Sequence, residues 1–82
     1  MDDEIRQVIR EHGRIPGDVE ALPREADLYA SGLTSHASVN VMLALEDRFD
    51  VEFPDRMLKR SVFASVAAIA NALLELRVEP VS

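Results

Sequence analysis

The sequence has no cysteine and no tryptophan, and its only aromatic residues are three phenylalanines and one tyrosine in a chain of 82 residues. Without cysteine the chain can form neither a disulfide nor a thiolate zinc site, so thiol chemistry would need a group attached to the protein. A core with so few aromatic rings must be built from aliphatic and methionine side chains, which favours helices. The length predicts a single domain, residues 1–82, with a thin core.

Basic residues are also scarce, because nine lysines and arginines stand against 15 aspartates and glutamates. The resulting net charge of −6 argues against binding to nucleic acid or to an anionic membrane. No apolar run approaches the roughly 20 residues that span a bilayer, and the acidic start, MDDEIRQ, does not have the pattern of a signal peptide. We therefore expect a cytoplasmic monomer that does not insert into a membrane.

Apolar residues at helical spacing predict an all-α fold with three longer helices and one short third helix. The longer helices are expected at about 3–12, 35–50 and 65–76, and the short one at about 55–60. The remaining segments are a long first loop, 13–34, and a frayed tail, 77–82. Residues 18–22 could form a short helical turn, and the loop as a whole is either a long ordered crossover or contains a true extra helix.

The helix starts and the core can be predicted from the same spacing. Thr34 or Ser35 can cap the 35–50 helix by accepting a backbone N–H, and Ser65 can do so for the last helix. The side chains expected to face the core are Ile5, Val8 and Ile9 in the first helix, Val39, Met42, Leu43, Leu45 and Phe49 in the 35–50 helix, Met57 and Leu58 in the short helix, Phe63 after it, and Val66, Ile69, Ala70 and Leu73 in the last helix. Those expected to hold the long loop to the core are Leu22, Leu28 and Tyr29.

One run of residues along the chain resembles a known family. Asp27-Leu28 in the long loop is followed by Gly32-Leu33, by Ser35, and by an apolar helix that contains Leu45-Glu46 and Phe49. Phe53-Pro54 and the segment from Phe63 to Ser65-Val66 come next without a gap. This order is similar to that of the acyl carrier proteins, a family that includes peptidyl and aminoacyl carriers. The resemblance covers most of the chain and implies a four-helix carrier bundle.

The resemblance implies that Ser35 receives 4′-phosphopantetheine from coenzyme A. The thiol of that arm would hold an acyl group as a thioester, and the protein would be a carrier rather than an enzyme. Its partners would be a phosphopantetheinyl transferase, a loading ligase and downstream transferases. The first expectation is an acyl carrier for fatty-acid, polyketide or related biosynthesis in lipid metabolism, and the alternative is an aminoacyl or peptidyl carrier. An unmodified helical adaptor is the alternative of another class, and Ser31 and Ser38 are weaker candidates for the attachment.

The chain departs from the family pattern beside the serine, where Thr34 replaces the usual aspartate and His36 the usual leucine. Positions that are often acidic in carriers of fatty acid synthesis are Ala37, Asn40 and Arg48 here. These departures suggest a specialised stand-alone carrier with its own loading enzyme. The residues expected to recognise partners are Thr34, His36, Val39, Asn40, Met42, Leu43, Asp47 and Met57.

Two further readings concern chemistry near Ser35. His36 is its neighbour, but adjacent helical residues point about 100° apart, so a nucleophile–base pair is not expected. The two histidines and scattered carboxylates match no metal-site spacing, and no metal is predicted. Met42, Leu43 and Met57 are expected either to line a pocket for an acyl chain or to belong to an ordinary core.

Overall fold

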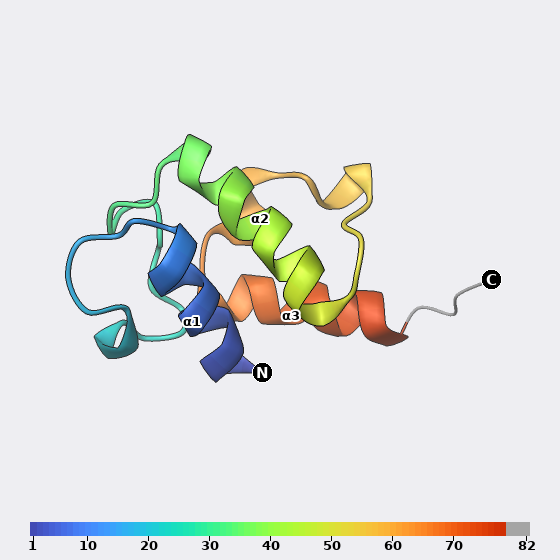
Figure 1. Ribbon diagram of the computed structural model, residues 1–82, viewed down its shortest axis with the longest axis horizontal. Helices are drawn as coiled ribbons and strands as arrows, with labels where there is room; N and C mark the ends of the chain where they lie inside the picture. Colours follow the sequence, from blue (N-terminus) through green and yellow to red (C-terminus); the bar gives the residue numbers. More distant parts are fainter. Residues whose placement is uncertain (79–82) are drawn as a thin grey trace.

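The computed structural model describes the backbone of residues 1–78 and the side chains of residues 1–76. Its α-helices are α1, Asp2–His12, α2, Ser35–Phe49, and α3, Val66–Val78 (Figure 1). Three short 3-10 helices lie between them: η1, Val19–Ala21, η2, Asp55–Met57, and η3, Arg60–Phe63. The described residues contain no strand, which confirms the all-α prediction. None of the helices found among them is both long enough and apolar enough to cross a membrane.

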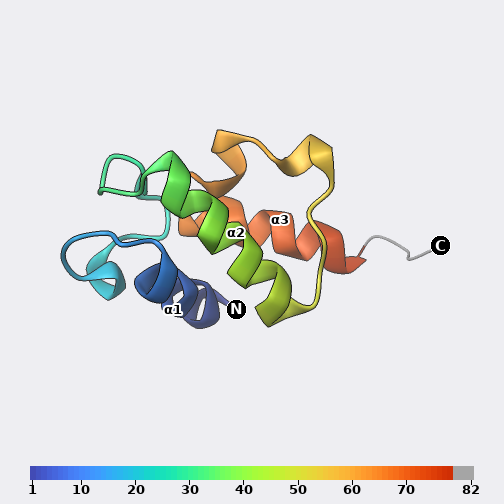
Figure 2. The same ribbon diagram turned by 45° about the horizontal axis from the view of Figure 1, so that its top comes forward.

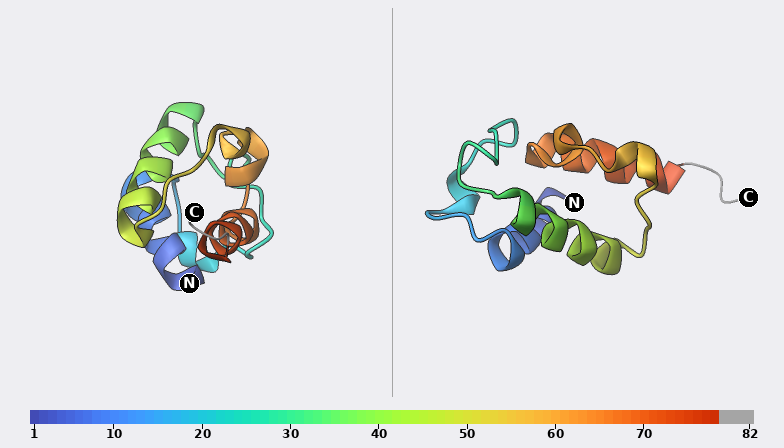
Figure 3. Two further views of the ribbon diagram at one scale, coloured as in Figure 1. Left: turned by 90° about the vertical axis from the view of Figure 1, so that its right-hand side faces the viewer. Right: turned by 90° about the horizontal axis from the view of Figure 1, so that it is seen from above.

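The three α-helices enclose one core. α1 packs against both α2 and α3, and η3 packs against α3 and α2. Seen from above, α2 and α3 lie in separate layers, with α1 on the side of α2 (Figure 3). The largest fully buried side chains come from every α-helix and from the long loop: Ile5, Ile9, Leu28, Val41, Leu45, Val66, Ile69 and Leu73.

α1 and α3 bury the faces that their spacing predicts. In α1 the buried residues are Ile5, Val8 and Ile9, and Asp2, Asp3 and Glu4 in its first turn suit the positive end of the helix dipole. α3 begins as predicted but continues to Val78, two residues beyond the expected end. Positions 77 and 78 of the predicted tail are therefore helical, and positions 79–82 lie outside the described residues. The buried side chains of α3 are Val66, Ile69, Ala70, Ala72 and Leu73.

The predicted apolar face of α2 is wrong in part. Its fully buried stripe is Ala37, Val41 and Leu45, whereas Val39 is 51% exposed and Leu43 is 52% exposed. Residues four apart lie on one side of a helix, and α2 carries apolar residues on more than one side. The pattern alone could not indicate which side meets the core, and two large apolar side chains remain at the surface.

The short third helix is also a correction. Residues 55–60 form no single helix, because η2 ends at Met57 and η3 begins only at Arg60. Between them Leu58 has a ψ of 62° and Lys59 is extended, so the hydrogen-bonded turn is interrupted. Met57 faces the core as predicted, whereas Leu58 is 48% exposed. This segment runs from the end of α2 back toward its start (yellow to orange in Figure 2).

The segment from Asp50 to Phe63, which follows α2, is held by a hydrogen bond near its start and by an aromatic contact between Phe53 and Phe63. Asp50 ends the helix in the left-handed conformation, with φ 53°. The Glu46 carboxylate on α2 then accepts the backbone N–H of Phe53 at 2.8 Å. The Phe53 and Phe63 rings meet edge to face with their centroids 5.3 Å apart. Phe63 is buried, as predicted, and the two rings brace η3 against the core.

The long loop, 13–34, is an ordered crossover with one short 3-10 helix, η1, within the segment 18–22 that was expected to form a helical turn. Arg6 on α1 donates to the carbonyl oxygens of Val19 and Leu22 at 2.9 and 2.7 Å, which attaches the loop to α1. The Leu28 N–H donates to the Ala64 carbonyl at 2.7 Å, which attaches it to the segment before α3. Leu28 is buried, and Leu22 and Tyr29 pack against the core, as predicted.

Candidate attachment site at the start of α2

Ser35 is the first residue of α2, and its side chain is exposed. The preceding residue, Thr34, has extended backbone geometry and caps the helix, because its hydroxyl oxygen accepts the Ala37 N–H at 3.0 Å. Of the two predicted caps, Thr34 is therefore the one used. Because Thr34 supplies the cap, the hydroxyl of Ser35 is left at the surface rather than turned back onto the helix.

The loop fixes where α2 begins. Gly32 has a φ of 121°, and a Cβ added there would lie 2.6 Å from Cδ of Pro16. Only glycine combines that backbone conformation with such a close approach. Leu33 follows, buried to 3% exposure, and its N–H donates to the Leu28 carbonyl at 2.9 Å. A turn that requires glycine and a buried leucine thus place Ser35, two residues after Leu33, at the surface.

The first turn of α2 can accept an anion. No acidic residue lies in it, and within residues 1–78 no acceptor is recorded for the backbone N–H of Ser35 or His36. Free N–H groups and the positive end of the dipole favour a negative group at a helix start. Ser38, one turn on, is different because its hydroxyl donates to the Ser35 carbonyl at 2.7 Å.

A pocket of about 330 Å³ opens beside Ser35, between the first half of α2 and the segment from Leu58 to Phe63, which includes η3. Its lining residues are Tyr29, Ser35, Ser38, Val39, Met42, Leu58, Lys59, Arg60 and Phe63. The lining from α2 follows the i, i+3, i+4, i+7 spacing of one helix side. The guanidinium carbon of Arg60 lies 4.0 Å from the centroid of the Tyr29 ring, a cation–π contact at the pocket wall.

The residues expected to recognise partners divide into three groups in the structure. Met42 and Val39 line the pocket, and Met57 is only 4% exposed and belongs to the core. Leu43 does not line this pocket, so the pocket foreseen from Met42, Leu43 and Met57 includes only the first of them. The exposed residues outside the pocket are Thr34, His36, Asn40, Leu43 and Asp47.

Sequence reasoning missed much of the pocket wall. Tyr29 comes from the long loop, where no periodic spacing indicates the direction of a side chain. Lys59 and Arg60 lie at and after the break in the predicted 55–60 helix, so the spacing of that helix did not indicate where their side chains point. The spacing of Ser35, Ser38 and Met42 was the available signal for the α2 side. No group of three or more histidine, aspartate and glutamate side chains that could hold a metal ion occurs in the described part of the chain.

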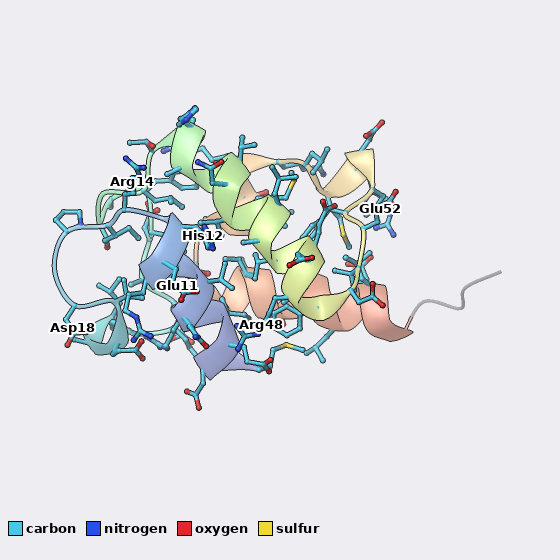
Figure 4. The ribbon with its side chains drawn as sticks, in the orientation of Figure 1. Glu11, His12, Arg14, Asp18, Arg48 and Glu52 are labelled. Atoms are coloured by element: carbon cyan, nitrogen blue, oxygen red, sulfur yellow. The ribbon has the colours of Figure 1, made fainter. Side chains whose placement is uncertain are left out.

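Arg48 near the end of α2 points toward α1 (Figure 4). Its Nε lies 3.5 Å from a carboxylate oxygen of Glu4, and its Nη2 donates to the Gln7 amide oxygen at 3.0 Å. The positive charge of Arg48, at a position expected to be acidic in carriers of fatty acid synthesis, therefore contacts α1 of the same protein.

Comparison with known proteins identifies the class. A family model described as "Phosphopantetheine attachment site" matches residues 3–73. The chain is 47% identical over 73 residues to a protein of Agrobacterium fabrum (strain C58) named aminoacyl carrier protein, covering 89% of this chain and 88% of that one. The chain belongs to the family of phosphopantetheine-dependent carrier proteins, which hold their cargo for other enzymes and do not catalyse its conversion themselves.

Solved structures agree in fold. One is a crystal structure of an engineered Bradyrhizobium japonicum glycine:carrier-protein ligase complexed with a carrier protein from Agrobacterium tumefaciens and AMP; the match has a TM-score of 0.88 and 46% identity, and covers 90% of this chain and 99% of that one. Another is the Bradyrhizobium japonicum ligase complexed with a glycylated carrier protein, with a TM-score of 0.72, 30% identity, and coverage of 87% and 95%. These relatives are aminoacyl carriers or partners of a glycine ligase.

The cofactor of this family, 4′-phosphopantetheine, fits the start of α2. A phosphodiester needs a hydroxyl that is accessible and an environment that tolerates negative charge. The exposed Ser35 hydroxyl, the N–H groups of Ser35 and His36 without recorded acceptors, and the lack of acidic residues in the first turn meet these needs. The arm also supplies the thiol that a chain without cysteine cannot provide.

Proposed function

We propose that this protein is an aminoacyl carrier whose 4′-phosphopantetheine arm is attached to Ser35. The observation that supports it most is an exposed serine at the first position of a capped helix, in a chain 47% identical to an aminoacyl carrier protein. When attached, the arm supplies a thiol that holds the aminoacyl group as a thioester. Of the two cargo classes that the sequence left open, the relatives support the aminoacyl class rather than a fatty acyl one.

Each residue at the site has a part in this function. The Ser35 hydroxyl forms the phosphodiester bond to the arm, with the transferase as catalyst and the adenosine bisphosphate part of coenzyme A as leaving group. The backbone N–H groups of Ser35 and His36 hold the phosphate, and the Thr34 cap keeps them parallel. Pro16 and Gly32 set the loop so that the serine stays outside the core.

The exposed side of α2 is the surface on which partners dock. His36, Asn40, Leu43 and Asp47 are spaced by four, three and four residues, so they form one stripe that begins next to Ser35. A phosphopantetheinyl transferase and an aminoacyl-loading ligase both have to reach Ser35 or its arm, and this stripe is the adjoining surface. The glycine ligase complexes of the relatives suggest glycine or a similarly small amino acid as cargo.

Intact-mass measurement tests the attachment. The protein is co-expressed with several phosphopantetheinyl transferases, and we expect a gain of one phosphopantetheine that Ser35→Ala abolishes. Ser38→Ala is the matched control, since its hydroxyl is engaged with the Ser35 carbonyl and the gain should persist. No gain with any transferase would favour the unmodified adaptor.

A second measurement tests the cargo. The modified protein is incubated with ATP, a panel of amino acids and the Bradyrhizobium japonicum glycine:carrier-protein ligase. We expect a mass gain of one small aminoacyl residue that hydroxylamine removes, as it removes a thioester. Loading by fatty acyl ligases in place of the glycine ligase would contradict the aminoacyl assignment while leaving the attachment to Ser35 intact.

A further inference from the structure

The pocket beside Ser35 combines apolar walls with positive charge. Val39, Met42, Leu58 and Phe63 supply apolar surface, and Lys59 and Arg60 are the charged residues among those that line it. None of the nine lining residues, all within the described part of the chain, is an aspartate or glutamate. A group that enters from Ser35 therefore meets cations and no carboxylate to balance a positive charge of its own.

Tyr29 would otherwise offer a place for a cation. An ammonium group can bind over the face of a tyrosine ring. In this pocket the guanidinium of Arg60 already lies over that ring, 4.0 Å from its centroid. Arg60 thus adds a repelling charge and also covers the aromatic face that could attract an ammonium.

An aminoacyl thioester ends in such an ammonium at neutral pH. Moving a charge from water into an apolar pocket is costly unless a partner of opposite sign compensates it. The phosphodiester on Ser35 brings one negative charge against the two cations, so the wall stays positive. An uncharged acyl group of the same size meets neither penalty.

We propose that Lys59 and Arg60 make this pocket exclude the ammonium of an aminoacyl cargo and admit uncharged acyl groups on the same arm. The aminoacyl thioester then stays in solvent, where a partner enzyme reaches it. An N-acylated aminoacyl group, such as N-acetylglycyl, carries no such charge and can enter. This inference rests on the proposed function, because it requires an arm on Ser35 and an aminoacyl group at its end.

The test compares a charged and an uncharged acyl group of the same size on the arm, with an N-acylated form of the charged group as a third. Glycyl and propionyl groups have equal numbers of heavy atoms, and only glycyl carries an ammonium. Stable amide analogues of both, and of the N-acetylglycyl arm, are attached enzymatically to the full-length protein. The methyl NMR signal of Met42 reports pocket entry relative to the protein with the unloaded arm. We expect propionyl and N-acetylglycyl to shift this signal several-fold more than glycyl does.

Variants identify the charges responsible. Arg60→Gln removes one cation and uncovers the Tyr29 ring, so the glycyl arm should then shift the Met42 signal nearly as far as propionyl. Lys59→Gln should have a smaller effect, because it leaves Arg60 on the ring. The double variant Arg60→Gln/Tyr29→Leu separates repulsion from ring exposure. Arg56→Gln is the matched control, since Arg56 pairs with Glu75 at 2.9 Å and does not line the pocket.

The outcomes are distinguishable. Equal shifts for glycyl and propionyl in the wild-type protein, or no shift for either, would overturn the exclusion and leave the carrier function standing. An unchanged glycyl spectrum in Arg60→Gln and Lys59→Gln would overturn the role of these two residues. Failure of every arm to attach to Ser35, seen by intact mass, would overturn the proposed function and this inference together.

Discussion

The starts of α2 and α3 use the same capping chemistry and have opposite surroundings. Thr34 accepts the Ala37 N–H at 3.0 Å, and Ser65 accepts the Ala68 N–H at the same distance. The next residue is the exposed Ser35 in α2 and the fully buried Val66 in α3. The residues that follow are Ala67 in α3 and His36 in α2. The backbone N–H of Ala67 donates to the carbonyl oxygen of Arg24 in the long loop at 2.8 Å, whereas no acceptor for the N–H of His36 is found among residues 1–78.

This difference shows what a cap does and does not decide. A hydroxyl at the N-cap determines where a helix begins, and it does so equally well in the core and at the surface. What makes the start of α2 a site is the exposed hydroxyl and the N–H groups that the protein leaves for a ligand. The start of α3 is closed, because the long loop occupies the position that a phosphate would take.

The largest expected contrast comes from the residue after each cap. Val66→Ala removes two buried methyl groups and should lower the free energy of unfolding by about 2 kcal/mol. Ser35→Ala should change it by less than about 0.5 kcal/mol, since the side chain is exposed. Urea denaturation measures both. A large loss of stability in Ser35→Ala would contradict the view that this serine is kept for modification rather than for folding.

The next largest loss of stability is expected from a substitution at Gly32, in the turn before α2. Gly32→Ala adds a Cβ 2.6 Å from Pro16 at a φ of 121° and should cost about 2 kcal/mol. Gly17→Ala is the matched control, because Gly17 also has positive φ but a Cβ there meets nothing within 4 Å. It should cost only about 1 kcal/mol. Thermal unfolding of the two variants should differ accordingly, and equal losses would show that the contact with Pro16 does not set the turn.

Loss of the Thr34 cap and loss of the Ser65 cap should destabilise the protein equally, but only loss of the Thr34 cap should affect phosphopantetheine attachment. Thr34→Ala and Ser65→Ala should each lower the free energy of unfolding by about 1 kcal/mol. Only Thr34→Ala should also slow phosphopantetheine attachment, because it loosens the N–H groups at Ser35. The rate is followed by intact mass with a transferase, and Thr34→Ser is the control that restores the cap. Equal attachment rates in Thr34→Ala and wild type would show that the Thr34 cap does not contribute to attachment at Ser35.

The smallest effect concerns the loop that closes α3. Asp2 and Arg24 form an ion pair at 2.7 Å, and the Arg24 hydrogen bond lowers the pKa of the Asp2 carboxyl. A carboxyl with a lowered pKa stabilises the fold at pH values above its ordinary pKa and loses that contribution as the pH falls through the lowered value. The stability difference between wild type and Asp2→Asn should therefore be constant near neutral pH and disappear in acid. Because the pair is largely exposed, high salt should also reduce it.

Several elements could be predicted from the sequence because their causes are local. α1 has one apolar stripe between an acidic start and Gly13, and α3 follows a serine that can cap it, so their spacing indicated their faces correctly. The cap at Thr34 and the short turn η1 also depend on neighbours within a few residues. The attachment site came from the order of Gly32-Leu33, Ser35 and Leu45-Glu46, which resembled the carrier family.

Other features depend on contacts between distant residues. Val39 and Leu43 were expected inside, but the buried side of α2 is that of Val41 and Leu45, and nothing local selects between two apolar sides of one helix. The predicted helix at 55–60 is interrupted at Leu58 and Lys59. The extended Lys59 leads into η3, where Phe63 packs edge to face against Phe53.

The sequence by itself determined that this protein is a small helical domain without its own thiol, with a hydroxyl at the head of a capped helix. Such properties follow from composition and from interactions within one turn of chain. Only the tertiary structure decided that Val41 and Leu45 of α2 are buried while Val39 and Leu43 stay at the surface, and that Tyr29, Lys59 and Arg60 meet at a pocket beside Ser35. Burial depends on which helix face the rest of the chain covers, and residues far apart in sequence become neighbours only when the core forms.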